Sequence, residues 1–343
     1  MSEPIRWAVN HMPKTEDANL PIMGLEEIKK ARAFHESFPQ YGKTPLTKLE
    51  HMASYLGLKE VYIKDESYRF GLNAFKVLGG SFAMARYIAS ETGKDVSDLP
   101  YSVLTSDKLR EEFGQATFFT ATDGNHGRGV AWAANKLRQK AVVHMPKGTT
   151  QTRLENIRKE GAQVDIQELN YDDCVRLAAK EADETPRGVI VQDTAWDGYE
   201  EIPSWIMQGY GTMAMEAGEQ LAEQGCDRPT HVFVQAGVGS LAGAVVGYFT
   251  NLYPDNVFYR TAYSFAQGDI LTFMCKNDGK VNWEWNIAWD DDNEPDQEEY
   301  LNFSKMLNDL RNGPLFEVLR YGRMVKPRAV HCGRYTEKVD RSD

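Results

Sequence analysis

Apolar and polar positions alternate regularly from about residue 60 to residue 264. Short runs rich in Val, Ile, Phe and Tyr are typical of buried strands, and they are separated by stretches with helical apolar spacing. The predicted strands are EVYIKDE (60–66), QATFFTAT (115–122), AVVHMP (141–146), AQVDIQEL (162–169), GVIVQDT (188–194), HVFVQAG (231–237) and NVFYRTAY (256–263).

Helices are predicted between these strands, at residues 75–89, 127–138, 152–161, 172–183 and 202–225. The last has the clearest period, because apolar residues recur every three or four positions at Ile206, Tyr210, Met213, Ala217 and Leu221. Pro203 suits its first turn and Gly225 suits its C-terminal end. Strand-helix alternation of this kind predicts an α/β fold with parallel sheets covered by helices.

The pattern changes near residue 265. NWEWNIAWDDDNEPDQEEY (282–300) carries three tryptophans and then an acidic run, which we interpret as a solvated loop or helix face. Residues 302–325 are predicted as a helix, a turn and a second short helix. We find no parallel-strand pattern after Tyr263.

Composition narrows the class of protein. The 343 residues are 42% hydrophobic and 26% charged, as in a globular protein, and the net charge is -11. An acidic chain is a poor partner for nucleic acid or for an anionic membrane surface. We find no signal peptide and no apolar run of membrane-spanning length. The four cysteines, at 174, 226, 275 and 332, form no C-x-x-C pair, which argues against zinc and favours a reducing cytoplasm.

Lys76 is the first candidate for chemistry. It lies in GLNAFKVLGG (71–80), which is otherwise nearly apolar. A helix start with a lysine whose ammonium reaches water explains this stretch. A lysine that loses its proton and acts as an amine nucleophile explains it as well.

The stretch TDGNHGRG (122–129) follows a predicted strand and precedes a predicted helix. Asp123 can act as a base, and Asn125 can donate and accept hydrogen bonds. A capped strand-to-helix turn is the simpler explanation. For His126 we favour a structural, hydrogen-bonded role.

QAGVGSLAGAVVG (235–247) also follows a strand and opens a helix. Backbone N–H groups at a helix N-terminus bind phosphate well, although the glycine spacing departs from G-x-G-x-x-G and tight packing also explains glycines. Together with Lys76, such a loop supplies what pyridoxal phosphate requires, namely an amine for a Schiff base and a phosphate site. The sequence has no G-x-S-x-G elbow and no P-loop lysine.

Four long blocks carry a family resemblance: KDESYRFGLNAFKVLGG, TATDGNHGRGVAWAA, VQDTAWDGYEEIPSWIMQGY and HVFVQAGVGSLAG. They resemble the diaminopropionate ammonia-lyases, pyridoxal-phosphate enzymes of the tryptophan synthase β-like (fold type II) superfamily. The resemblance extends from about residue 31 to residue 249. It implies α,β-elimination of D- and L-2,3-diaminopropionate to pyruvate and ammonia, in a cytoplasmic homodimer.

The resemblance also implies roles for individual residues. Lys76 corresponds to the lysine that holds the cofactor as a Schiff base, and Asn125 to the residue that bonds its ring hydroxyl. Asp123 and Asp193 correspond to acidic active-site residues, with Lys76 and Asp123 as bases on opposite faces. The phosphate loop corresponds to Gly237, Val238, Gly239, Ser240 and Ala242.

The implied fold pairs a large domain, residues 1–78 and 195–343, with a small α/β domain, residues 79–194. Residues 265–343 depart from the family pattern, because its SGESG-like segment is absent. An alternative is therefore a catalytically impaired, truncated or frame-shifted remnant, and a second alternative is another fold type II enzyme such as a serine/threonine dehydratase.

Overall fold

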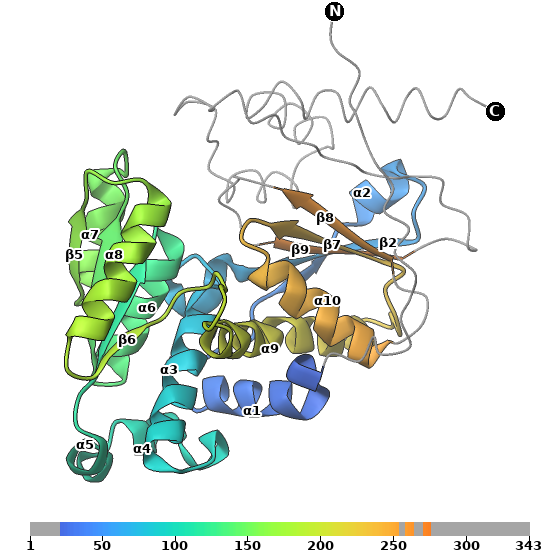
Figure 1. Cartoon of the computed structure of the whole chain (residues 1–343). Helices are drawn as coiled ribbons and strands as arrows, with labels where there is room; N and C mark the ends of the chain where they lie inside the picture. Colours follow the sequence, from blue (N-terminus) through green and yellow to red (C-terminus); the bar gives the residue numbers. More distant parts are fainter. Residues whose placement is uncertain (1–20, 254–257, 264–269, 276–343) are drawn as a thin grey trace, which may run out of the picture.

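The computed structural model describes residues 21–253, 258–263 and 270–275. Its strands form two separate sheets, one of four strands and one of five (Figure 1). The acidic tryptophan segment and the two helices predicted beyond residue 300 lie outside the described residues.

The four-stranded sheet is parallel throughout, with strand order β5-β4-β3-β6. Its strands are β3 (Thr117–Ala121), β4 (Lys140–Met145), β5 (Gln163–Ile166) and β6 (Gly188–Ile190). The connecting helices are α6 (Asn125–Lys136), α7 (Gln151–Lys159) and α8 (Tyr171–Glu184). The predicted strand-helix alternation is confirmed here.

Helices cover both faces of this sheet. Phe118 belongs to the main apolar core, which also contains Ile157 of α7, whereas Phe119 packs with Ala178 and Ala182 of α8. Successive strand residues point to opposite faces. Helices α7 and α8 therefore lie on opposite faces of the sheet, and the connections reverse direction between β3 and β6.

The five-stranded sheet is mixed, with strand order β1-β2-β9-β7-β8. Its strands are β1 (Leu46–Lys48), β2 (Glu60–Asp65), β7 (His231–Ala236), β8 (Phe258–Tyr263) and β9 (Ile270–Cys275). Among these described strands only β7 and β8 pair in parallel; the other neighbours are antiparallel. Strand β9, between β2 and β7, was not among the predicted elements.

Long helices support this sheet and connect it to the first one (Figure 1). They are α1 (Leu25–Glu36), α3 (Val77–Thr92), α9 (Glu201–Glu223) and α10 (Ser240–Leu252). Pro203 lies in the first turn of α9 and Gly225 follows its end with φ +79°, as the sequence predicts. The remaining helical segments are Pro21–Met23, α2 (Glu50–Tyr55), Glu66–Gly71, Val96–Asp98, α4 (Tyr101–Leu104) and α5 (Asp107–Phe113).

Helices α3 and α9 approach each other closely because both carry glycine at the contact. A Cβ atom on Gly209 would lie 2.4 Å from the carbonyl oxygen of Leu78, and one on Gly79 would lie 2.6 Å from the ring of Tyr210. Only glycine fits such a contact without displacing backbone. The first turn of α3, which follows Lys76, is thereby fixed against α9.

A buried charge network connects β2 to α9. Lys64 Nζ donates to Glu216 Oε2 at 2.7 Å, and Arg69 donates to both Glu216 and Glu66. Glu66 and Glu216 are fully buried. Burial alone would raise the pKa of Glu216, but Arg69 and Lys64 hold it far below its ordinary value. The four side chains are therefore buried as a paired network of opposite charges.

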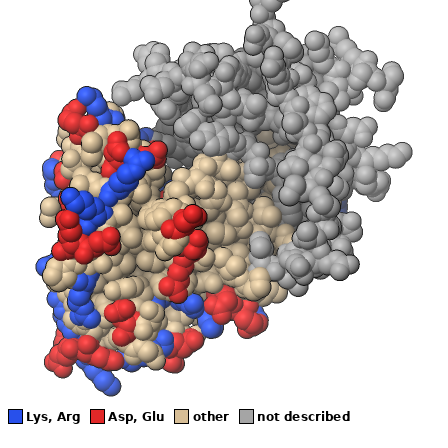
Figure 2. All heavy atoms as spheres, viewed as in Figure 1, with Lys and Arg blue, Asp and Glu red and all other residues tan. Residues whose placement is uncertain are grey.

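The described residues also test the predictions about surface charge, cysteines, membrane helices and metal sites. Figure 2 shows acidic and basic side chains interspersed over the lobe formed by α6, α7 and α8. Cys174 and Cys226 are both buried. Among the described residues, no helix is long and apolar enough to cross a membrane, and no group of His, Cys, Asp and Glu could hold a metal ion. The predicted division at residues 78/79 and 194/195 falls within α3 and between β6 and α9; it stays a prediction.

Candidate active site

Lys76 occupies the position immediately before α3. The chain reaches it through an irregular segment in which Phe70 and Asn73 both have positive φ, +48° and +58°. Phe75 and Val77 on either side are buried in the core, whereas the Lys76 side chain is 30% exposed. The lysine is thus held by a rigid apolar frame while its amine remains accessible.

Asp193 is the partner of this amine. Lys76 Nζ donates to Asp193 Oδ2 at 2.6 Å, and the Asp193 side chain is only 2% exposed. Burial would raise the pKa of Asp193, but the charges of Lys76 and His126 and the hydrogen bond from Lys76 together lower it to about 2. The structure therefore brings two of the predicted site residues together as a close ion pair.

His126 lies beside this pair in the first turn of α6. Its Nε2 bonds to the carbonyl oxygen of Val191 at 2.9 Å, and its Nδ1 lies 3.8 Å from Asp193 Oδ2. Burial, and then the charge of Lys76, lower the pKa of His126 against the opposing effect of Asp193. It is a buried, hydrogen-bonded histidine, as predicted.

The loop that carries Asp123 and Asn125 is anchored next to Lys76. A Cβ atom on Gly129 would lie 2.8 Å from the Cα of Val77, so α6 begins directly against the start of α3. The backbone N–H of Gly124 donates to Thr122 Oγ1 at 2.9 Å, which forms the turn. Asn125, the first residue of α6, is half-buried.

Asp123 differs from Asp193 in its exposure. Its side chain is 73% exposed, and its backbone carbonyl accepts a hydrogen bond from Arg153 Nη1 at 2.9 Å. Its charge nevertheless reaches the site, because it opposes the lowering of the His126 pKa and contributes to the raised pKa of Tyr171. The carboxylate of Asp123 is exposed to solvent, whereas that of Asp193 is buried.

The sequence analysis missed three polar residues that frame the site. Gln192 Nε2 donates to the hydroxyl of Tyr171 at 2.7 Å, and Gln192 Oε1 accepts from Thr120 Oγ1 at 2.8 Å. The Tyr199 hydroxyl accepts from the backbone N–H of Gln192 at 2.8 Å. Burial raises the pKa of both tyrosines well above the ordinary value. Gln192 and Tyr199 lie within the block around Asp193 that carries the family resemblance, whereas Tyr171 lies outside all four blocks.

The predicted phosphate loop joins β7 to α10. Gly237, Val238 and Gly239 are exposed, and Gly239 has φ +100° immediately before the helix. A Cβ atom on Gly237 or Gly239 would meet nothing within 4 Å, whereas one on Gly243 would lie 2.9 Å from Met207 Cε. Tight packing thus explains Gly243 but does not explain the first two glycines. Ser240 opens α10 and Ala242 is buried in its first turn.

Lys76 and this loop lie against the same turn of α9. Gly79, in the first turn of α3, contacts Ile206 and Tyr210, and Gly243, in the first turn of α10, contacts Met207. The start of α3, which follows Lys76, and the start of α10 are therefore both fixed against neighbouring residues of α9.

The topology of the small sheet agrees with this location. Asp123 follows the carboxyl end of β3, and Asp193 follows that of β6. The connections reverse between these two strands, and such a switch point is where ligands bind in open α/β sheets.

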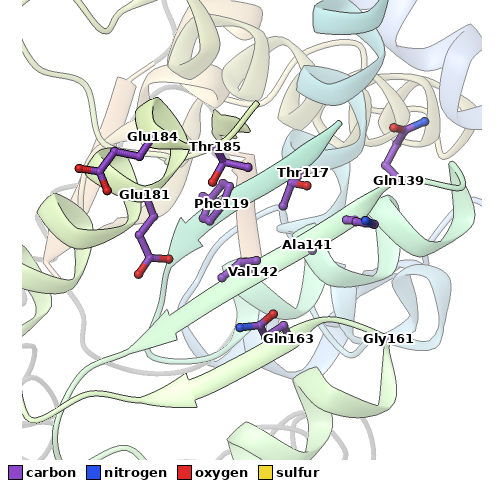
Figure 3. A pocket seen from close by; sticks show the side chains of 11 residues that line it. Thr117, Phe119, Gln139, Ala141, Val142, Gly161, Gln163, Glu181, Glu184 and Thr185 are labelled. Carbon is purple, nitrogen blue, oxygen red and sulfur yellow. The ribbon is translucent and has the colours of Figure 1, made fainter. Parts of the chain in front are cut away.

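A separate cavity of about 590 Å³ lies at the opposite end of the same sheet (Figure 3). Its lining includes residues from the amino ends of β3, β4 and β5 and from the end of α8. The lining residues are Thr117, Phe119, Gln139, Lys140, Ala141, Val142, Gly161, Gln163, Glu181, Glu184 and Thr185. None of the predicted site residues borders it. We assign the chemistry to the carboxyl ends of this sheet, because Asp193 and its ion pair with Lys76 follow the carboxyl end of β6.

Comparison with known proteins agrees with the fold. The family model described as pyridoxal-phosphate dependent enzyme matches residues 38–266, and the chain belongs to this family. The chain is 55% identical over 259 residues to the diaminopropionate ammonia-lyase of Salmonella typhimurium, covering 75% of this chain and 64% of that enzyme. It is 48% identical over 239 residues to that of Escherichia coli, covering 69% and 58%.

A solved structure is also similar. The Escherichia coli diaminopropionate ammonia-lyase in complex with D-serine matches with a TM-score of 0.67 and 46% identity, over 71% of this chain and 61% of that one. The chain spans less than two thirds of the length of the relatives that it matches. The predicted family and fold class are confirmed.

The residues present fit pyridoxal phosphate. An accessible amine is held by a buried carboxylate, and two glycines with open space above them precede a helix N-terminus. These are the groups that an aldehyde and a phosphate need.

Proposed function

We propose that this chain catalyses the pyridoxal-phosphate-dependent α,β-elimination of D- and L-2,3-diaminopropionate to pyruvate and ammonia. The observation that carries the proposal is the Lys76–Asp193 ion pair at 2.6 Å, at the switch point of the small sheet. The 55% identity to an enzyme of that name supports the choice of substrate. A homodimer in the cytoplasm is part of the proposal and rests on the family resemblance.

In this proposal each predicted residue has a defined role. Lys76 holds the cofactor covalently, and its amine takes the Cα proton from one face of the substrate. Backbone N–H groups of Gly237, Val238 and Gly239, with Ser240 and Ala242, hold the phosphate. Asn125 bonds the ring hydroxyl. The cofactor, when bound, supplies an electron-withdrawing ring that acidifies the Cα–H bond.

Asp123 and Asp193 have different roles in this proposal, one as a base and one in positioning the lysine. Asp123 is exposed to solvent, so its carboxylate is accessible to substrate and is proposed as the base for the D enantiomer. Asp193 is buried and stays ionised because of Lys76, so we assign it the task of orienting the lysine amine. Two bases on two faces explain how one site could accept both enantiomers.

The remnant and the dehydratase are the competing functions. The strong identity to ammonia-lyases favours the lyase over a dehydratase. The remnant hypothesis rests on residues 265–343, and of this segment the structure describes only residues 270–275.

The test measures pyruvate release by the full chain, supplied with pyridoxal phosphate, from D- and L-diaminopropionate, D-serine, L-serine and L-threonine. We expect the highest kcat/KM for diaminopropionate. A higher value for serine or threonine would support the dehydratase. Cofactor bound without pyruvate release from any substrate would support the remnant.

A further inference from the structure

The ring of His126 has one bonded and one unpaired nitrogen. Its Nε2 lies 2.9 Å from the carbonyl oxygen of Val191. A carbonyl only accepts, so Nε2 carries the hydrogen and a neutral ring has a bare lone pair on Nδ1. The ring is buried, with a side chain 4% exposed, and Nδ1 has no hydrogen-bond partner among the described residues.

This lone pair faces another acceptor. Nδ1 lies 3.8 Å from Asp193 Oδ2, and the same oxygen accepts the hydrogen bond from Lys76 Nζ at 2.6 Å. Two acceptors that face each other leave a vacant place for one hydrogen. A proton on Nδ1 would let the histidine donate to Asp193.

We propose that His126 is the acceptor for the proton that Lys76 must lose before its amine can react. The proton passes from Lys76 Nζ to Asp193 Oδ2 and on to His126 Nδ1. One N–H bond breaks at the lysine and one forms at the histidine, while Asp193 begins and ends as a carboxylate. The sum of the three charges is unchanged. Only the role of Lys76 as the reactive amine rests on the proposed function.

The charges around His126 favour this exchange. They come from three segments: Lys76 before α3, Asp193 after β6 and Asp123 after β3. Burial and the ammonium of Lys76 lower the pKa of His126, whereas the two aspartates raise it. When Lys76 becomes neutral, one of the lowering influences disappears. Proton loss by the lysine and proton gain by the histidine therefore favour each other, as linkage requires.

The first experiment measures the histidine directly and needs no cofactor. Nitrogen chemical shifts of 15N-histidine-labelled full chain report the protonation of each ring, and the His126→Gln spectrum assigns the signal. We expect the His126 pKa to rise by about 1–3 units in Lys76→Met, the range for removal of a nearby like charge. An unchanged pKa in that variant would overturn the proposal.

The second experiment uses the reactive amine as its readout. In His126→Gln the introduced side-chain amide can still donate to the Val191 carbonyl, but the variant has no proton acceptor in the place of Nδ1. Borohydride trapping of pyridoxal phosphate on Lys76 is measured as a function of pH. We expect the half-maximal pH to rise by about 1 unit relative to wild type.

The matched control is His144→Gln. His144 is another buried histidine, in strand β4, bonded to Asp165 and Glu181 rather than to Lys76 or Asp193. Its trapping profile is expected to match that of the wild type. Equal shifts in both variants, or a shift in neither, would contradict the role of His126. If the wild type traps no cofactor at any pH, the proposed function fails, and the nitrogen shifts still decide the inference.

Discussion

Lys76 and Asp193 form a close ion pair although they are 117 positions apart in the chain: Nζ donates to Oδ2 at 2.6 Å. One residue precedes the first helix after the large-sheet strand β2, and the other follows the last strand of the small sheet. The pair thus connects the two sheets at one point. The predictions below concern four residues of the site and one residue of the buried charge network.

Lys76→Ala is expected to abolish the covalent link to pyridoxal phosphate, because no other amine replaces the one held by Asp193. Borohydride reduction followed by peptide mapping measures the link. Lys64→Ala is not a suitable control, since Lys64 is buried in the charge network; Lys43→Ala, at an exposed ion pair, is. A reducible link that survives in Lys76→Ala would disprove the assignment.

Asp193→Asn is expected to change the acid stability of the protein. The pKa of Asp193 is lowered from 3.8 to about 2 in the fold. A lowered pKa stabilises the fold above the unfolded-state value and loses that contribution as pH falls from about 4 to about 2. The contribution at neutral pH is about 2 kcal/mol.

Urea unfolding of wild type and Asp193→Asn, at pH 7 and near pH 3, measures this difference. The stability gap between the two proteins should narrow as pH falls. A gap that is independent of pH would mean that the carboxylate charge contributes nothing.

Gly239→Asp is expected to weaken cofactor binding roughly tenfold or more, because a carboxylate at the helix N-terminus opposes the phosphate. The backbone there has φ +100°, so any side chain adds strain. Gly239→Asn is the matched control, since it adds the same strain and bulk without the charge. Binding is measured by titrating apo-protein with pyridoxal phosphate. If both variants lose affinity equally, strain rather than charge is responsible. If Gly239→Asp binds the cofactor as tightly as the wild type, the loop does not hold the phosphate.

Glu216→Leu is expected to destabilise the fold by about 3–5 kcal/mol, because it leaves Arg69 and Lys64 buried beside an apolar side chain. Denaturant unfolding at pH 7 measures the loss. Glu219→Leu on the same helix is the control, because Glu219 is 43% exposed and its pairs contribute little. A loss below about 1 kcal/mol for Glu216→Leu would show that the network is not needed for stability.

The alternating strands and helices of the fold could be predicted from local sequence patterns, whereas the pairing of strands that are distant in the sequence could not. Each of the strands β2 to β8 has an apolar run in the sequence, so each could be predicted without reference to its neighbours. Strand β9 is different, because it inserts antiparallel between β2 and β7, whose residues are far away in the sequence. Register between distant strands leaves no local signal.

Of the site residues, only those in an unusual sequence context could be predicted from the sequence. Lys76 is conspicuous because an apolar segment surrounds it, and Gly239 because a glycine loop precedes a helix. Family resemblance assigned Lys76 and Asp193 to the site separately, but their pairing was not predicted, since no spacing rule connects them. Gln192 and Tyr171 could not be selected, because glutamine and tyrosine are common on surfaces and only the fold makes them neighbours.

Asp123→Asn is expected to lower the turnover of D-diaminopropionate far more than the turnover of the L enantiomer. A single lysine amine reaches one face of a planar reaction centre, so the D and L substrates need bases on opposite faces. Asp123 is the accessible carboxylate next to the site, with a side chain 73% exposed, and its replacement by Asn keeps the shape while removing the basicity.

Turnover of D-diaminopropionate should fall about 10²–10⁴-fold, the usual effect of a lost general base. The L enantiomer is the internal control and should lose much less. Pyruvate release from each enantiomer, after wild-type turnover has been established, measures both. Equal losses would show instead that Asp123 acts on the cofactor or on the turn before α6, because such effects do not distinguish one face of the substrate from the other.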